Sequence, residues 1–319
     1  MTAACRLIGC MLIAVSILDQ FQTLFYPAGH GTLSSWIGKI VWRLIRPIGR
    51  WKKNALTFAG PISMLLIIVV WANLLLFGWA LLFYPELGSF TMMQGIDPQQ
   101  HHTFADAVNI SLGSLITLAG DMMPTKRFLR FAMGVEGVVG FGLLTASVSW
   151  LLSVYPILES ARSFAQQVMS MYSAREKAKI NLLDLPESEA LTIFLELATQ
   201  LATVRNQMAQ FPVTYYFNVG ERKTGLSVVM PFVAYLADKA EVDQRPGVRL
   251  AGCVLGHAVK AFAEFIGGTF LDLPNADRNS ILIALAKDHM RGPVGVDLMQ
   301  RSGALSRVVT GRLNAREAG

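Results

Sequence analysis

The chain has 319 residues and a formal net charge of +6; 53% of its residues are hydrophobic and only 16% are charged. Soluble domains carry about a quarter charged residues, so the composition excludes a wholly soluble enzyme, a disordered tail and a disulfide scaffold. The three cysteines, Cys5, Cys10 and Cys253, lack the spacing of metal ligands, and we interpret them as structural. We therefore expect a membrane protein.

Charge is distributed unevenly along the chain, which predicts how it lies across the bilayer. Residues 1–56 carry seven Lys and Arg and a single acid, Asp19. Residues 57–125 carry no base and four acids: Glu86, Asp97, Asp106 and Asp121. Because short loops rich in Lys and Arg stay in the cytoplasm, we expect the segment around 39–53 to be cytoplasmic and the segment around 86–121 to be external.

Residues 1–27 are predicted to form an N-terminal hydrophobic helix. Its apolar stretch, from Leu7 to Leu18, leaves three interpretations open: a span with the N-terminus outside, a helix in the interface, and a cleaved signal peptide. No small-x-small site follows Leu18, which disfavours the signal peptide. Residues 28–55 form a basic linker in which Trp36, Ile37 and Ile40 alternate with Lys39 and Arg43 at helical spacing. This pattern is typical of an amphipathic helix on an anionic leaflet.

Residues 56–84 and 127–156 are each long enough and apolar enough to cross the bilayer, the first outward and the second inward. Between them, 104–117 is apolar but too short to cross. A short apolar helix that stops and reverses at 118–121 is typical of a re-entrant segment, and irregular backbone at that depth must border a cavity or pore. The alternative is a short helix lying flat on the outer surface.

The order of these segments resembles the pore module of the two-transmembrane potassium channels, and in particular bacterial proteins of the potassium channel family. The resemblance covers most of the chain. The residues that carry it are Asp19, Phe21, Thr23, the run 104–107, Ser111, Leu115, Thr117, Leu118, Gly120, Asp121, Pro124, and the runs 142–156 and 211–217.

The resemblance implies a pore module over 56–156, with an outer helix 56–84, a pore helix 104–117, a filter 117–121 and an inner helix 127–156. It also implies a homotetramer, since each chain supplies one pore segment. Family filters read Thr-x-Gly-Tyr-Gly-Asp, whereas this chain reads Thr117, Leu118, Ala119, Gly120 and Asp121. Because one residue and the aromatic side chain are missing, we expect a pore that selects weakly among monovalent cations, K⁺ being the ion that the family conducts.

Three residues of the inner helix, Glu136, Gly137 and Gly140, are gating or pore-lining candidates. An ionisable group within a span is costly and usually faces a cavity or partner, although Glu136 could also lie at the interface. Glycines allow close helix contact or a bend, and both interpretations stay open. Asp121 would concentrate cations at the pore mouth, or merely cap a helix.

Residues 157–319 are expected to form a cytoplasmic helical domain. His257 and His289 have no second ligand at helical spacing, and no phosphate-binding glycine motif follows a strand, so we expect neither a metal site, an organic cofactor nor an enzyme. The expected fold is thus an all-α membrane protein of the bacterial inner membrane that conducts monovalent cations, with lipid and its own copies as partners and no nucleic acid. The alternative is a non-conducting structural or sensory protein that retains the scaffold.

Overall fold

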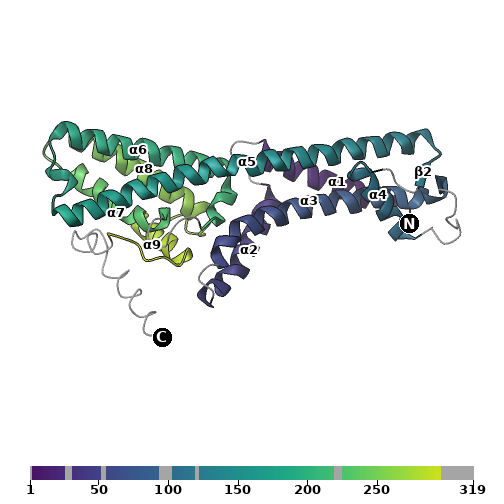
Figure 1. The fold of residues 1–319 in the computed structure, drawn as a ribbon, viewed down its shortest axis with the longest axis horizontal. Coiled ribbons are helices and arrows are strands. Elements are labelled where there is room, and N and C mark those ends of the chain that lie inside the picture. The colour runs from purple at the N-terminus through teal and green to yellow at the C-terminus, as the bar shows by residue number, and fades with distance from the viewer. Residues whose placement is uncertain are drawn as a thin grey trace. The chain divides into compact units, whose positions relative to one another are not determined.

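The computed structural model describes residues 2–25, 31–51, 55–92, 103–118, 122–218 and 225–295, and these are mostly helical (Figure 1). The α-helices are α1 Thr2–Leu24, α2 Thr32–Trp51, α3 Ala59–Phe83, α4 Phe104–Leu115, α5 Arg127–Ala178, α6 Glu187–Gln210, α7 Leu226–Glu241, α8 Pro246–Thr269 and α9 Arg278–Asp288. Short 3₁₀ helices are η1 Ala55–Phe58, η2 Tyr84–Ser89, η4 Leu182–Asp184 and η5 Pro212–Tyr216. The strands β1 Phe90–Met92 and β2 Met122–Pro124 pair antiparallel. The expected all-α architecture is confirmed.

The chain divides into two compact units. Unit 1 comprises Met1–Leu44 and Pro61–Val154, and unit 2 comprises Ile45–Gly60 and Tyr155–Gly319. Helix α5, at 52 residues, is a single helix that contributes to both units. The sequence predicted an inner helix over 127–156, and the structure continues that helix to Ala178.

In unit 1, α1 and α3 lie antiparallel along each other. Arg6 Nη2 pairs with Glu86 Oε1 at 2.6 Å near one end, and Ser16 Oγ donates to the Trp71 carbonyl at 3.1 Å nearer the other. Between these contacts, a Cβ at Gly9 would lie 2.6 Å from the Gly78 carbonyl oxygen. Small residues therefore let the two backbones approach closely, as in packed transmembrane helices.

Asp19 joins the end of α1 to the start of α2 and to α3. Its side chain is 4% exposed and accepts hydrogen bonds from Trp71 Nε1 at 2.8 Å, Leu33 N at 2.9 Å, Ser34 N at 3.2 Å and Ser34 Oγ at 2.5 Å. A carboxylate in this position satisfies the free amides at a helix N-terminus and complements its dipole. The lone acid of the basic N-terminal region therefore fixes where α2 begins.

Four helical segments of the described chain are long and apolar enough to cross a membrane: α1, α3 with its flanking 3₁₀ turns, α5 and α8. The 23 residues of α1 extend over about 34 Å and the 25 of α3 over about 37 Å, against a hydrocarbon core of about 30 Å. Large apolar side chains stay exposed on α1 and on the first half of α5, among them Leu7, Met11, Phe131, Val138, Phe141 and Leu144. Surfaces of this kind require lipid or another subunit.

Unit 2 is a helical bundle around α7, which is buried along most of its length. Helix α8 packs on both α6 and α7 (Figure 1). The ring of Tyr172 of α5 contacts that of Phe232 of α7, with centroids 5.0 Å apart. The opposite face of α8 is exposed and carries Arg249, His257 and Lys260 together with the apolar Leu250 and Val254. Because one side of α8 is apolar and packs on α6 and α7 while the other includes charged residues, α8 has the amphipathic character of a bundle helix.

Candidate functional site

Helix α4 lies in a segment of the chain whose two ends pair with each other as β-strands. The strands β1 and β2, on either side of it, pair with Phe90 opposite Pro124 and Met92 opposite Met122. The chain therefore leaves and returns at one place. With 12 residues, α4 is about 18 Å long, little more than half of the hydrocarbon thickness.

The first turn of α4 lies next to the end of α3. Thr103 precedes the helix, and Asp106 accepts hydrogen bonds from Thr103 N at 2.9 Å and Thr103 Oγ1 at 2.6 Å. An acid in the first turn complements the helix dipole. The ring of Phe104 contacts Tyr84 edge-on, with centroids 5.8 Å apart.

Two serines in the C-terminal half of α4 attach it to the backbones of both neighbouring helices. Ser111 Oγ lies 2.9 Å from the Leu76 carbonyl of α3, and Ser114 Oγ donates to the Met133 carbonyl of α5 at 2.8 Å. Hydroxyls commonly bridge helices in this way in membranes. Helix α4 is therefore held between α3 and α5 by polar contacts in its C-terminal half.

Glu136 of α5 is fully buried against α4. Its Oε1 lies 2.5 Å from Ser111 Oγ, and its Oε2 has no hydrogen-bond partner among the described residues. A hydroxyl has one hydrogen and a carbonyl can only accept, so Ser111 can bond both the Leu76 carbonyl and Glu136 only when the Glu136 carboxyl supplies a hydrogen. Hydrogen counting thus favours a protonated Glu136 in this arrangement.

The end of α4 is a Schellman turn. Leu118 N donates to the Gly113 carbonyl at 2.8 Å and Thr117 N to the Ser114 carbonyl at 3.0 Å, the two bonds that define this motif. Thr117 has φ +58°, a left-handed conformation that costs an L-residue about 1–2 kcal/mol and is rare for a β-branched one. The strain falls on the first residue of the predicted filter.

Two glycines of α5 leave room for this turn. A Cβ at Gly137 would lie 3.4 Å from the Ser114 carbonyl oxygen, and one at Gly140 would lie 2.9 Å from the Leu115 carbonyl carbon and closer still to its oxygen. Gly140 lies 13 residues after Arg127, or about 20 Å along α5. The C-terminal end of α4 therefore lies well along α5 and not beside the N-terminal end of α5.

The predicted site residues divide into two groups. Glu136, Gly137 and Gly140 come together at the α4–α5 contact, Thr117 forms the turn beside them, and Leu118 is 64% exposed. Ala119, Gly120 and Asp121 lie outside the described residues. Three His, Cys, Asp or Glu side chains do not cluster as a metal site anywhere in the described part of the chain.

Sequence reasoning did not single out Ser114, the left-handed turn at Thr117 or the pairing of Asp19 with α2. The spacing of Ser111 and Ser114, three residues apart on a short apolar helix, is the signal that could have indicated helix-to-helix bonding. The other two features depend on contacts between distant segments, which local patterns do not reveal.

Comparison with known proteins supports the membrane assignment. Over 213 residues, or 66% of its length, the chain is 25% identical to an uncharacterized membrane protein, YdjJ, of Bacillus subtilis strain 168. The protein is an all-α membrane protein. The match covers 62% of the length of that relative. No protein-family model matches the chain, and no solved structure matches it.

Proposed function

We propose that the protein forms a homotetrameric, potassium-channel-like pore in the bacterial cell membrane and passes monovalent cations down their gradient. The observation that carries the proposal is the placement of α4, a helix too short to cross that starts and returns at one end of the α3–α5 pair. Its C-terminal end lies opposite Gly140. In this proposal α4 is the pore helix, 117–121 is the filter, and unit 2 faces the cytoplasm.

The electrostatics of α4 favour cations. The C-terminal end of a helix carries about half a negative charge, and within a span that charge is poorly screened. The turn at Thr117 reverses the chain beside this end, so that the residues after it can direct carbonyl oxygens towards an ion, as ion filters do. An ion passing there would exchange part of its hydration shell for these oxygens.

Several copies are needed to enclose such a path. Each chain supplies one α4, and the exposed apolar residues Leu118, Val138 and Phe141 need either lipid or a neighbouring copy as cover. Rings of identical subunits are the usual way to build a closed path. A fourfold arrangement follows from the resemblance to the potassium channels.

The filter sequence argues against strict K⁺ selectivity. Ala119 stands where the family has a glycine, and a side chain there disfavours the alternating backbone angles of a K⁺ filter. A filter that is one residue shorter also has one ring of carbonyls fewer. We therefore propose weak discrimination among K⁺, Na⁺ and Cs⁺, with Asp121 at the outer mouth concentrating cations.

One observation favours the rival function, a non-conducting structural or sensory protein. Glu136, Gly137 and Gly140 all contact α4 in a single chain, so close packing explains these residues without a gate or an open path. A scaffold that has lost conduction would retain the same contacts.

Ion flux from liposomes containing the purified full chain separates the two functions. The conducting protein should release K⁺, Na⁺ and Cs⁺ at rates within about tenfold of one another, because a filter without the full set of carbonyl rings discriminates poorly. Asp121→Asn should lower single-channel current at low salt and leave it nearly unchanged at high salt, where surface charge is screened. Absence of flux over a range of voltage and pH, from protein that is folded and tetrameric, would reject conduction.

A further inference from the structure

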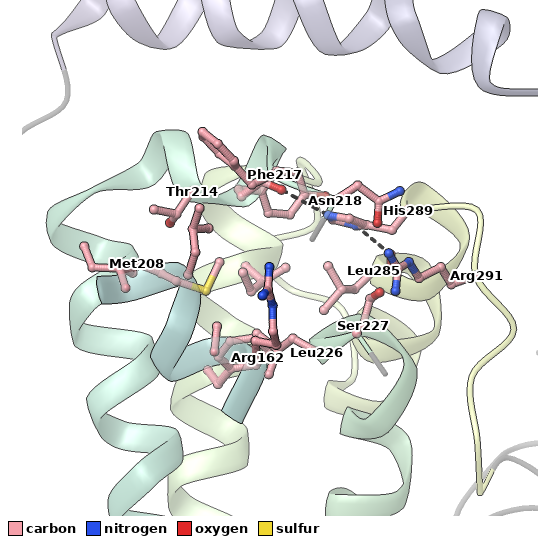
Figure 2. A pocket seen from close by; sticks show the side chains of 17 residues that line it. Arg162, Met208, Thr214, Phe217, Asn218, Leu226, Ser227, Leu285, His289 and Arg291 are labelled. Carbon is pink, nitrogen blue, oxygen red and sulfur yellow. Dashed lines mark hydrogen bonds between the residues drawn. The ribbon is translucent and has the colours of Figure 1, made fainter. Parts of the chain in front are cut away.

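Unit 2 contains a cavity of about 70 Å³ that the proposed conduction does not use. Its walls come from four places: α5 around Ile157 and Arg162, η5 with the two residues after it, the start of α7, and the end of α9 with Arg291 (Figure 2). The floor is apolar and includes Met208, Phe262, Ile266 and Leu285.

The polar groups of the cavity are cationic or neutral. Figure 2 shows the Arg162 guanidinium standing among the lining residues, with Arg291 and the Ser227 hydroxyl on the side of α9. No Asp or Glu is among the described residues that line the cavity. Two acids adjoin lining residues in sequence: Glu159 follows Leu158 and is exposed, and Asp288, which precedes His289, is bound by Tyr215 Oη at 2.6 Å and pairs with Arg46 at 3.2 Å. Among the described residues, the positive charge of the cavity therefore has no lining carboxylate to balance it.

Two of these groups have no partner among the residues that the structure describes. Ser227 is 5% exposed, and no hydrogen bond joins its hydroxyl to another described residue. Arg162 is exposed, and within the same ranges it makes neither a hydrogen bond nor an ion pair. The Ser227 hydroxyl is not among the described buried oxygens that lack a partner, so it has some open space beside it, and the Arg162 guanidinium is exposed. Both donors line one cavity and are available to the acceptors of a ligand.

His289 adds no further charge to that of the two arginines. Its Nε2 lies 3.0 Å from the Tyr215 carbonyl oxygen and its Nδ1 lies 3.2 Å from the Leu285 carbonyl oxygen, and because a carbonyl only accepts, the neutral ring donates to one of the two. Burial lowers the pKa of His289 below its ordinary value, and nearby Arg291 lowers it further. The cavity is thus expected to present guanidinium charge and a neutral imidazole at neutral pH.

We propose that this cavity binds a small organic oxyanion, with its carboxylate or phosphate on Arg162, Arg291 and Ser227 and a short apolar tail on the floor. Guanidinium groups bind both kinds of oxyanion through paired N–H donors. A cavity of about 150 Å³ accommodates benzene, so the space here limits the buried tail to about three or four heavy atoms. Binding at this site does not depend on the proposed conduction.

The ligand would rest directly on α5. Ile157 and Arg162 belong to the same uninterrupted helix as Glu136 and Gly140. Occupancy would therefore act on the helix that holds the end of α4.

The test is binding to the detergent-solubilised full chain, measured by thermal stabilisation and calorimetry with butyrate, inorganic phosphate and 1-butanol as probes. Butyrate should bind and raise the unfolding temperature, phosphate should bind more weakly because it lacks a tail, and butanol should have no effect. Equal stabilisation by butanol, or failure of both anions to bind, would overturn the proposal. Phosphate binding as tightly as butyrate would overturn the contribution of the apolar floor.

Matched variants assign the site. Arg162→Gln should weaken butyrate binding by about tenfold or more, the usual cost of losing a charged hydrogen bond, and leave the unliganded unfolding temperature unchanged. Lys260→Gln removes the same charge from an exposed position on α8 outside the cavity, and it should change neither quantity. Ser227→Ala should weaken binding without destabilising the free protein, since its hydroxyl has no partner among the described residues to lose. If Arg162→Gln and Lys260→Gln bind butyrate equally, the assignment is wrong.

Discussion

The Gly140→Ala substitution tests whether α4 lies against α5 at the depth described. An alanine Cβ would approach the Leu115 carbonyl carbon to 2.9 Å and lie 3.1 Å from the Leu115 Cδ1. Ordinary carbon contacts begin at about 3.5 Å, and the carbonyl oxygen is nearer still, so the end of α4 must retreat by about 1 Å or more. Because the obstacle is backbone rather than a flexible side chain, the movement displaces the turn at Thr117.

Overpacking of this kind lowers the free energy of unfolding by about 1–3 kcal/mol. The higher helix propensity of alanine offsets up to about 1 kcal/mol of this loss. The expected result is net destabilisation of up to about 2 kcal/mol when the full gain in helix propensity is subtracted, together with a loss of cation flux. Gly142→Ala is the matched control, since a Cβ at Gly142 meets nothing within 4 Å. This change should be neutral or slightly stabilising and leave flux intact.

The assay is thermal unfolding in detergent for both variants, followed by liposome flux. Equal unfolding temperatures for Gly140→Ala and Gly142→Ala would refute the packing of α4 on α5. If Gly140→Ala is destabilised but its flux is unchanged, the packing of α4 on α5 is supported, but the turn at Thr117 does not contribute to conduction.

Three further perturbations test the parts around the site. Asp19→Asn should lower the free energy of unfolding by about 3–6 kcal/mol, because the amide nitrogen would face the donors Trp71 Nε1 and Ser34 N and two charge-assisted hydrogen bonds would be lost. Glu176→Gln is the neutral control, since the Glu176 side chain is 57% exposed. Similar unfolding temperatures for the two variants would contradict the role of Asp19. Glu136→Gln should leave stability nearly unchanged and abolish the infrared band of a protonated carboxyl; absence of that band in the wild type would refute the hydrogen count. Hydrogen bonds from Arg245 lower the pKa of Asp243 from 3.8 to about 2. The contribution of this pair to stability is therefore present above about pH 4 and is lost as the pH falls towards 2. The unfolding temperature of an Asp243→Asn variant should change less over this range than that of the wild type, and an identical pH dependence in both proteins would show that the pair is not stabilising.

The sequence predicts the features that depend on composition and local length. Segment α3 is recognisable because it lies within 32 uncharged residues, between Lys53 and Glu86, and the start of α5 is recognisable because Glu136 alone interrupts the 28 residues between Arg130 and Glu159. Helix α4 is recognisable because it is apolar and short. These properties belong to single segments, so they need no knowledge of neighbours.

Features set by contact between segments could not be predicted in the same way. Four glycines of α5, at 134, 137, 140 and 142, look alike in sequence, yet a Cβ would meet α4 only at Gly137 and Gly140. The left-handed Thr117 runs against the preference of a β-branched residue, so no propensity indicates it. From the sequence alone, Asp19 is a charged residue that should destabilise an apolar helix in a membrane. The structure shows that Trp71, 52 residues away, donates a hydrogen bond to it.

The bonds that Asp19 receives have a practical meaning for shortened versions of the protein. A version lacking α1 would leave the Trp71 indole and the opening amides of α2 without an acceptor, within or beside lipid, where no water can replace one. Such a fragment would have to bury those donors elsewhere or assemble incorrectly. Helix α1 therefore stabilises α2 and α3, and fragments prepared for experiments should retain it.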